Sequence, residues 1–187
     1  PGARIREMAV AVPKELLAAL LVVAVLALIT VLVIAIFLRA LLINPLEIGC
    51  KRLYLRNLIE DADVKEICYT YDRGYKNGVT VLFYRDLYMI GWILLLVIPA
   101  VFKYYEYRMI PFIMAEKPDT PKEQAFAMSK EMMRGNKWRS FLLDLSCILC
   151  DILGVITFGL VGIFYVTPYK NSTDAALYQA VRLRASV

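Results

Sequence analysis

Histidine is absent from this chain of 187 residues. Histidine is the commonest general base in enzymes and the commonest protein ligand for catalytic metals, so its absence argues against triad hydrolysis and ordinary zinc catalysis. The sequence also contains no Walker loop, no Gly-x-Gly-x-x-Gly and no Gly-x-Ser-x-Gly. We therefore predict a protein that is not an enzyme and that has no catalytic residues, no metal site and no cofactor.

Cysteine is scarce as well, because four residues are too few and too scattered for a disulfide scaffold. Cys147 and Cys150 form a Cys-x-x-Cys pair inside an apolar segment. A redox pair of this kind opens a helix, a metal site needs two further ligands, and neither context is present. We expect both cysteines to be small packing residues.

Polar residues are few for a soluble protein, since 60% of the residues are hydrophobic and the mean hydropathy is +0.58. Soluble domains contain about 45–50% apolar residues. The composition therefore predicts an integral membrane protein. The net charge of +5 and the pI near 9.0 are typical of basic loops that face anionic lipid headgroups, so we expect membrane lipid, and not nucleic acid, as a partner.

The first predicted membrane span covers residues 16–43. No charge and only one polar residue, Thr30, occur between Leu16 and Leu38, and about 20 apolar residues are enough to cross a hydrocarbon core. This run is too long for a signal-peptide core, and no small-residue cleavage site follows it. We expect a helix that Asn44-Pro45 ends.

Two further membrane segments are predicted at residues 79–102 and 138–169. We expect Pro99 to kink or break the second segment near its end. The last segment is too long for one straight span and contains several glycines, so a broken helix or a hairpin fits it better. A hairpin divides the Lys and Arg residues of the loops fourteen to six between the two sides, whereas three simple crossings divide them eleven to nine. The positive-inside rule therefore favours the hairpin.

Amphipathic helices at the membrane surface are predicted over residues 46–60 and 121–134, where apolar residues recur at helical spacing. The spacing of Asp63 and Glu66 indicates a capped short helix running towards Tyr71, and Gly74 and Gly78 are expected to break it. Thr120 is the expected N-cap of the second amphipathic helix, with a stop signal at Gly135.

Four ionisable residues within the predicted spans form a candidate intramembrane polar site: Asp144, Asp151, Arg85 and Asp86. Asp144 and Asp151 share one helix face, and charges at membrane depth often mark ion or proton paths. The alternative is structural, with Asp144 near the interface and paired with a base such as Arg85 or Lys103.

Several motifs from Asn44 onward form a characteristic series: Asn44-Pro45-Leu46-Glu47-Ile48-Gly49, Arg85-Asp86-Leu87, Trp92 to Pro99, Tyr107-Arg108-Met109, Ala115-Glu116, Ser129 to Met133, Gly135, Lys137-Trp138, Leu143-Asp144-Leu145-Ser146, Thr157-Phe158-Gly159-Leu160 and Pro168-Tyr169. Over this part the chain resembles the DUF975 family of bacterial integral membrane proteins, whose function is unknown. The sequence departs from the family pattern between Cys147 and Asp151. The resemblance implies a multi-pass protein of the bacterial cytoplasmic membrane, and it supplies no catalytic residues.

Together these features predict a single membrane domain over residues 1–187, built as an all-α polytopic transmembrane helical bundle with interfacial amphipathic helices. As function we predict a non-enzymatic accessory or scaffold component that contacts lipid or partner membrane proteins, or assembles with itself. The alternative is a transporter or channel subunit with a polar path lined by Asp144 and Asp151.

Overall fold

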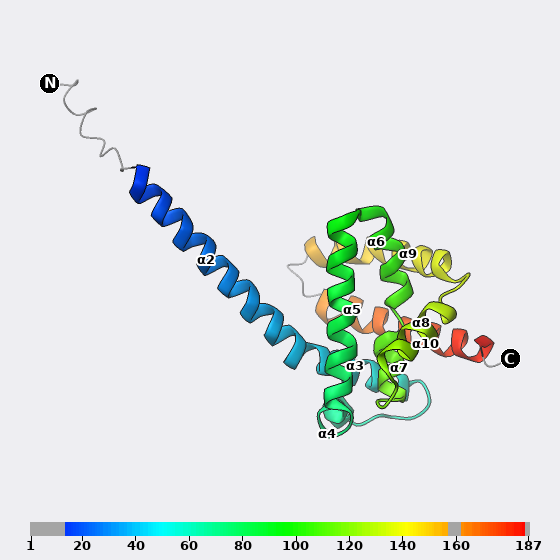
Figure 1. Cartoon of the computed structure of the whole chain (residues 1–187). Helices are drawn as coiled ribbons and strands as arrows, with labels where there is room; N and C mark the ends of the chain where they lie inside the picture. Colours follow the sequence, from blue (N-terminus) through cyan, green and yellow to red (C-terminus); the bar gives the residue numbers. More distant parts are fainter. Residues whose placement is uncertain (1–13, 157–161, 186–187) are drawn as a thin grey trace. The chain divides into compact units, whose positions relative to one another are not determined.

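A computed structural model describes residues 14–156 and 162–185, without the side chains of residues 149–156, 163, 164 and 185. Every regular element in these ranges is helical, which confirms the predicted all-α class (Figure 1). The elements are α2 (Lys14–Leu38), a π-helical segment (Arg39–Ile43), α3 (Asn44–Asn57), a 3-10 helix (Val64–Cys68), α4 (Tyr69–Asp72), α5 (Tyr75–Leu95), α6 (Val97–Tyr107), α7 (Ile110–Glu116), α8 (Lys122–Met132), α9 (Lys137–Ile156), a second π-helical segment (Gly162–Val166) and α10 (Thr167–Ala185).

The chain divides into two compact units, residues 1–39 and 40–187. In the first unit, α2 has 25 residues, and none of its side chains is buried. Thr30, the one polar side chain of α2 after Glu15, donates its hydroxyl to the carbonyl oxygen of Leu26 at 2.9 Å. The hydroxyl is thus satisfied within the helix, and α2 presents an apolar surface on every side.

The π-helical segment before α3 is explained by Pro45. A proline has no N–H to donate and its ring collides with the carbonyl four residues earlier, which here belongs to Leu41. The wider turn relieves this collision. The hydroxyl of Tyr75 donates to the Leu41 carbonyl at 2.9 Å, and that of Tyr71 donates to the Leu42 carbonyl at 2.9 Å. The helix therefore continues past the proline. The prediction that it ends at Asn44-Pro45 was wrong.

The predicted amphipathic helix at 46–60 is α3, whose Ile48, Gly49 and Leu55 are buried. Gly49 has no room for a side chain, because a Cβ there would lie 1.9 Å from the carbonyl oxygen of Ile67. This close approach locks α3 against the 3-10 helix that follows. The Asp63 side chain caps that helix by accepting from the backbone N–H of Lys65 at 3.1 Å, which confirms the predicted capped start.

Helices α5 and α6 form a hairpin that is joined by the single extended residue Leu96, and they pack against each other (Figure 1). The break precedes Pro99 by three residues, which places the proline in the first turn of α6, where an N–H has no helical partner anyway. The predicted segment 79–102 is thus shared between two helices that run in opposite directions.

Two predictions about glycines near this hairpin have different outcomes. Gly74 has a φ of +75° and ends the short α4 region, as expected. Gly78 does not break the chain, and that prediction was wrong. It lies inside α5, where a Cβ would touch the side chains of Ile48 and Thr70, so its small size serves helix packing.

The core of the second unit is built around α7, a helix of seven residues of which six, Ile110 to Ala115, are buried. Helices α3, α5 and α8 contact it, and Tyr178 of α10 stacks on Phe112 with 5.3 Å between ring centroids. Helix α10 has 19 residues, and its apolar face is buried in this core.

Helices occur in the last two regions for which the sequence predicted them. Helix α8 covers the predicted segment 121–134, although Pro121, and not Thr120, occupies its N-cap, and Gly135 with a φ of +80° follows its end. The predicted segment 138–169 contains α9, the second π-helical segment and the start of α10, and residues 157–161 lie outside the described part.

Candidate functional site

A buried arginine joins three helices of the second unit by ion pairs. Arg108, just after α6, donates to both carboxylate oxygens of Asp144 on α9 at 2.8 Å, and to Asp174 on α10 at 2.6 Å. Only 10% of the Arg108 side chain is exposed. The Tyr105 hydroxyl donates to Asp144 at 3.0 Å. We call Arg108, Asp144 and Asp174 the central triad.

The central triad is extended to α3 by Lys51. Its ammonium donates to the side-chain oxygen of Asn171 at 2.7 Å and lies 3.5 Å from Asp174. The same ammonium lies 5.0 Å from the centroid of the Phe112 ring, so the lysine also contacts the apolar core. Two cations thus share the two carboxylates of the central triad, and α3, α9 and α10 are tied to the end of α6.

A second ion cluster lies one turn away on α3. Arg85 of α5 donates to both oxygens of Glu47 at 2.7 and 2.9 Å, and to its neighbour Asp86 at 2.8 Å. Arg85 is 9% exposed. The planar guanidinium matches a carboxylate in this two-bond arrangement, which fixes the direction of approach as well as adding energy. Glu47 therefore anchors α5 to α3.

A third cluster surrounds Glu106 on α6. Lys103 and Lys137 both pair with its carboxylate, and the Ser129 hydroxyl donates to its backbone carbonyl. Burial by itself would raise the pKa of Glu106, but the two lysines outweigh it and hold that pKa below its ordinary value. The pairing joins α6 to α8 and to the start of α9.

A polar hollow of about 370 Å³ opens beside the central triad. It is lined by Tyr104, Arg108, Ile148, Asp144, Thr167, Lys170, Asn171 and Asp174. Burial, together with the hydrogen bond to Asp144, raises the pKa of Tyr105 next to it to about 12, so this tyrosine stays a neutral donor. The hollow offers charged groups of both signs, and its Arg108, Asp144 and Asp174 are already paired with one another.

The structure places Asp144 in a different ion cluster from Arg85 and Asp86, which pair with each other. Asp144 is paired as the structural alternative required, but its partner is Arg108, whereas Arg85 and Lys103 have other carboxylate partners. Arg85 and Asp86 belong to the Glu47 cluster. Asp151 lies in α9, and its side chain is outside the described residues.

Sequence reasoning missed Arg108, Asp174, Glu47 and Lys51. Arg108 and Asp174 are 66 positions apart, and no local pattern joins residues at such a distance. A weak signal did exist on α3, because Glu47 and Lys51 are four residues apart and therefore share a helix face. Their partners on other helices are set only by tertiary packing.

The next features are the potential metal ligands and the cysteines of the described ranges. Within residues 14–156 and 162–185, no group of three or more His, Cys, Asp or Glu side chains is placed to hold a metal ion. Three cysteines of the described part, Cys50, Cys68 and Cys147, are not in disulfides, and Cys147 is buried at 4% exposure. The buried Cys147 agrees with its predicted packing role.

The family described as "Protein of unknown function (DUF975)" matches residues 65–185. The chain belongs to the DUF975 family. The matched range contains Arg85, Arg108, Asp144 and Asp174, whereas Glu47 precedes it, as does the predicted Asn44-to-Gly49 motif. No curated protein and no solved structure matches the chain.

Among the described residues, two helical stretches are long and apolar enough to cross a membrane. They are the continuous helical run from Lys14 to Asn57 and the 21-residue α5. In the most apolar part of the first stretch, none of the residues is buried. In the most apolar part of α5, 22% of the residues are buried. The core helix of a soluble protein would be mostly buried, so this exposure distinguishes the two stretches from such a helix.

Proposed function

We propose that this DUF975 protein is a non-enzymatic, multi-pass component of a bacterial cytoplasmic membrane, which acts as an accessory or scaffold that contacts lipid and partner membrane helices. The observation that carries the proposal is α2, with 25 residues, no charge after Glu15 and no buried side chain. Each exposed apolar side chain would cost free energy in water, at about 25 cal/mol per Å². Lipid or other helices remove this cost.

The α5–α6 hairpin supports insertion at a second place. Its uncharged stretch runs from Leu87 to Phe102, and the side chains at its tip are largely exposed, with Leu94 at 88% and Ile98 at 73%. The 11 residues of α6 span about 16 Å, which is shorter than a hydrocarbon core of about 30 Å. We therefore propose that this hairpin enters the membrane and returns to the side from which it came.

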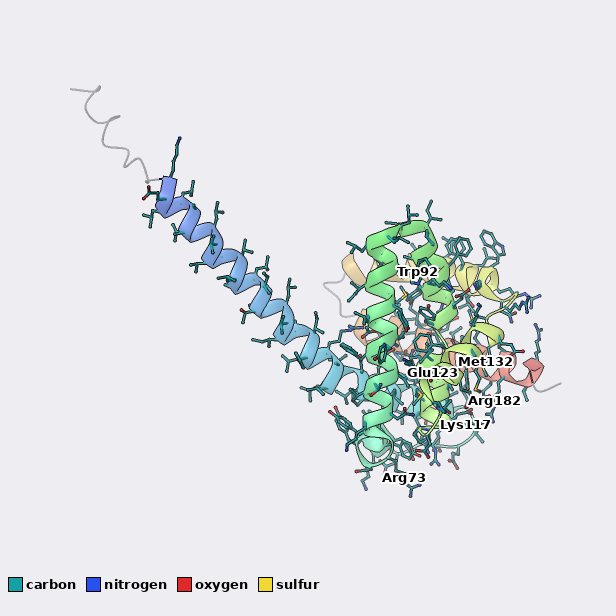
Figure 2. The ribbon with its side chains drawn as sticks, viewed as in Figure 1. Arg73, Trp92, Lys117, Glu123, Met132 and Arg182 are labelled. Atoms are coloured by element: carbon teal, nitrogen blue, oxygen red, sulfur yellow. The ribbon has the colours of Figure 1, made fainter. Side chains whose placement is uncertain are left out.

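One basic and one aromatic side chain lie where the hairpin would meet the lipid headgroups. The Lys103 ammonium lies 5.4 Å from the ring centroid of Trp92, a residue labelled on α5 in Figure 2. Trp and Lys side chains are enriched where helices meet lipid headgroups. Below this level follow the buried charges of Arg85 and Glu106, which are held by protein partners and not by lipid.

The pairing of the buried charges favours a scaffold over a conducting path. Asp144 and Asp174 are both engaged by Arg108, and Glu47 is engaged by Arg85. A path residue must release and take up an ion, whereas these carboxylates are bound by charge-assisted hydrogen bonds that are costly to break. The central triad with Lys51 and the Glu47 cluster together connect five helices, α3, α5, α6, α9 and α10, as a framework does.

The second candidate is the transporter or channel subunit, and the hollow of about 370 Å³ beside Asp144 is the observation in its favour. A flux assay separates the two. Purified protein is reconstituted into vesicles loaded with protons, sodium or potassium, and release is compared with that from vesicles containing the Asp144→Asn variant. The scaffold proposal expects no flux above that of empty vesicles in either case, together with co-purification of a partner or of further copies. Flux that Asp144→Asn abolishes would establish the transporter instead.

A further inference from the structure

Three arginines from three different elements line one hollow of about 380 Å³ in the second unit. Arg134 lies in the turn after α8, Arg139 on the first turn of α9, and Arg184 near the end of α10. The other lining residues are Glu131, Met132, Gly135, Asn136 and Val181. We call this hollow the arginine pocket.

The arginine pocket has an uncompensated positive charge. Other arginines of this unit have carboxylate partners: Arg52, Arg85 and Arg108 pair with Glu66, Glu47 and Asp144. Arg182, two residues before Arg184, pairs with Glu116. None of the three pocket arginines forms an ion pair with a described residue within 4 Å, and the one acid of the pocket, Glu131, forms none either. Three cations against one carboxylate repel one another unless an anion joins them.

The backbone at the pocket is open to a ligand. Gly135 turns the chain between α8 and α9 with a φ of +80°, and nothing lies within 4 Å of a Cβ built on it. Asn136 holds the turn, because its amide donates to the carbonyl of Met132 at 3.2 Å. Met132 also lines an adjoining hollow of about 380 Å³ with Lys117 and Arg182, all three of which are labelled in Figure 2.

An apolar surface begins directly beside the pocket, on the first turns of α9. Trp138 precedes Arg139 and is 67% exposed, and its ring stacks on Phe141 with 5.3 Å between centroids. Leu142 and Leu145 continue this exposed face along the helix. Exposed Trp next to Arg is the arrangement found where helices meet the headgroup layer.

We propose that the arginine pocket binds the phosphate of an anionic phospholipid, whose acyl chains lie on the exposed apolar face that starts at Trp138. Guanidinium groups match phosphate oxygens in pairs of charge-assisted hydrogen bonds, which makes arginine well suited to this task. The apolar face selects a lipid over a soluble phosphate. This inference rests on the proposed membrane function and names the lipid class and the residues that bind it.

The test is native mass spectrometry of the full chain in detergent, with titrated phosphatidylglycerol or phosphatidylcholine. The test variant is Arg134→Gln, Arg139→Gln and Arg184→Gln combined, and all three side chains are exposed, so the fold does not depend on them. The control variant combines Arg73→Gln, Lys76→Gln and Lys130→Gln, which removes the same charge from exposed residues outside the pocket.

We expect wild type and control to retain one phosphatidylglycerol molecule with equal affinity, and the test variant to bind it at least tenfold more weakly. Equal binding of phosphatidylcholine by wild type, or equal loss of phosphatidylglycerol in both variants, would overturn the proposal. Competition by soluble glycerol phosphate at the same affinity would show a free-phosphate site instead. Membrane insertion is scored separately, by whether an alkaline carbonate wash releases the chain, so that failure of the site and failure of the membrane proposal are distinguishable.

Discussion

Replacing Arg108 by methionine tests whether the central triad stabilises the fold of the second unit. The substitution keeps an unbranched apolar chain in place of the arginine's aliphatic part but leaves Asp144 and Asp174 without the cation that contacts both at 2.6 to 2.8 Å. Side-chain exposure is 10% for the arginine, 28% for Asp144 and 15% for Asp174. Breaking a buried ion pair by removing one partner costs about 3–5 kcal/mol, because the remaining charge is uncompensated.

We take about 3 kcal/mol as the expected loss, because Lys51 remains 3.5 Å from Asp174 and Asp144 is partly solvated. For a chain of this size, 1 kcal/mol corresponds to a shift in Tm of about 2–4 °C. The Arg108→Met variant should therefore melt about 6–12 °C below wild type when unfolding in detergent is followed by intrinsic fluorescence.

The matched control is Arg73→Met, since Arg73 is exposed, has no ion pair with a described residue and is labelled at the end of α4 in Figure 2. Its Tm should change by less than 2 °C, as surface substitutions cost at most about 0.5 kcal/mol. A further variant, Arg108→Met with Asp144→Asn and Asp174→Asn, should recover most of the loss, because it removes the unpaired charges as well. Equal melting of Arg108→Met and Arg73→Met would refute the reasoning.

Three further predictions follow from local geometry. Gly49→Ala should destabilise the fold by more than about 2 kcal/mol, because the new Cβ has no room. Gly91→Ala should stabilise the fold by about 0.5–1 kcal/mol, because no atom lies within 4 Å of the new Cβ. Chemical denaturation measures both changes. The pKa of Glu106 is lower in the folded protein than in the unfolded chain, so its ion pairs stabilise the fold above pH 4.3, roughly the unfolded pKa. This stabilisation is lost as the pH falls through the lower folded pKa. Glu106→Gln should therefore flatten the acid limb of a curve of Tm against pH. Tyr75→Phe removes a hydroxyl that serves a carbonyl of the π-helical segment and should cost about 1 kcal/mol in urea titrations, whereas Tyr54→Phe, with no such bond, should cost nothing measurable.

The helical class and the positions of most helices could be predicted from the sequence, because they depend on local signals. An uninterrupted apolar run, a capping aspartate at Asp63 and a glycine at Gly135 act within a few residues. The break at Leu96 was predicted at Pro99 instead, since the proline determines that a break is needed nearby but not on which residue it falls. No local sequence signal predicts which side of the α5–α6 turn faces α3.

The candidate site was predictable only in part, for the same reason. Asp144 was recognised as a costly charge that needs a partner, and it has one. Arg108 was not recognised as that partner, because it follows an aromatic and charged stretch that resembles an ordinary headgroup contact. Only the packing of α6 against α9 turns it inward. The pocket of Arg134, Arg139 and Arg184 likewise exists only in three dimensions.

The most direct test of the central claim is the membrane depth of the α5–α6 tip. A spin label is attached at Leu94→Cys or at Ile59→Cys in a background without native cysteines, and both positions are at least 80% exposed in the structure. Collision with oxygen and with a water-soluble nickel chelate is then measured by electron paramagnetic resonance in liposomes. The account predicts that the label at position 94 collides with oxygen and not with nickel, and that the label at position 59 collides with nickel. Nickel accessibility at position 94 equal to that at position 59 would contradict the account, because the tip would then lie in water.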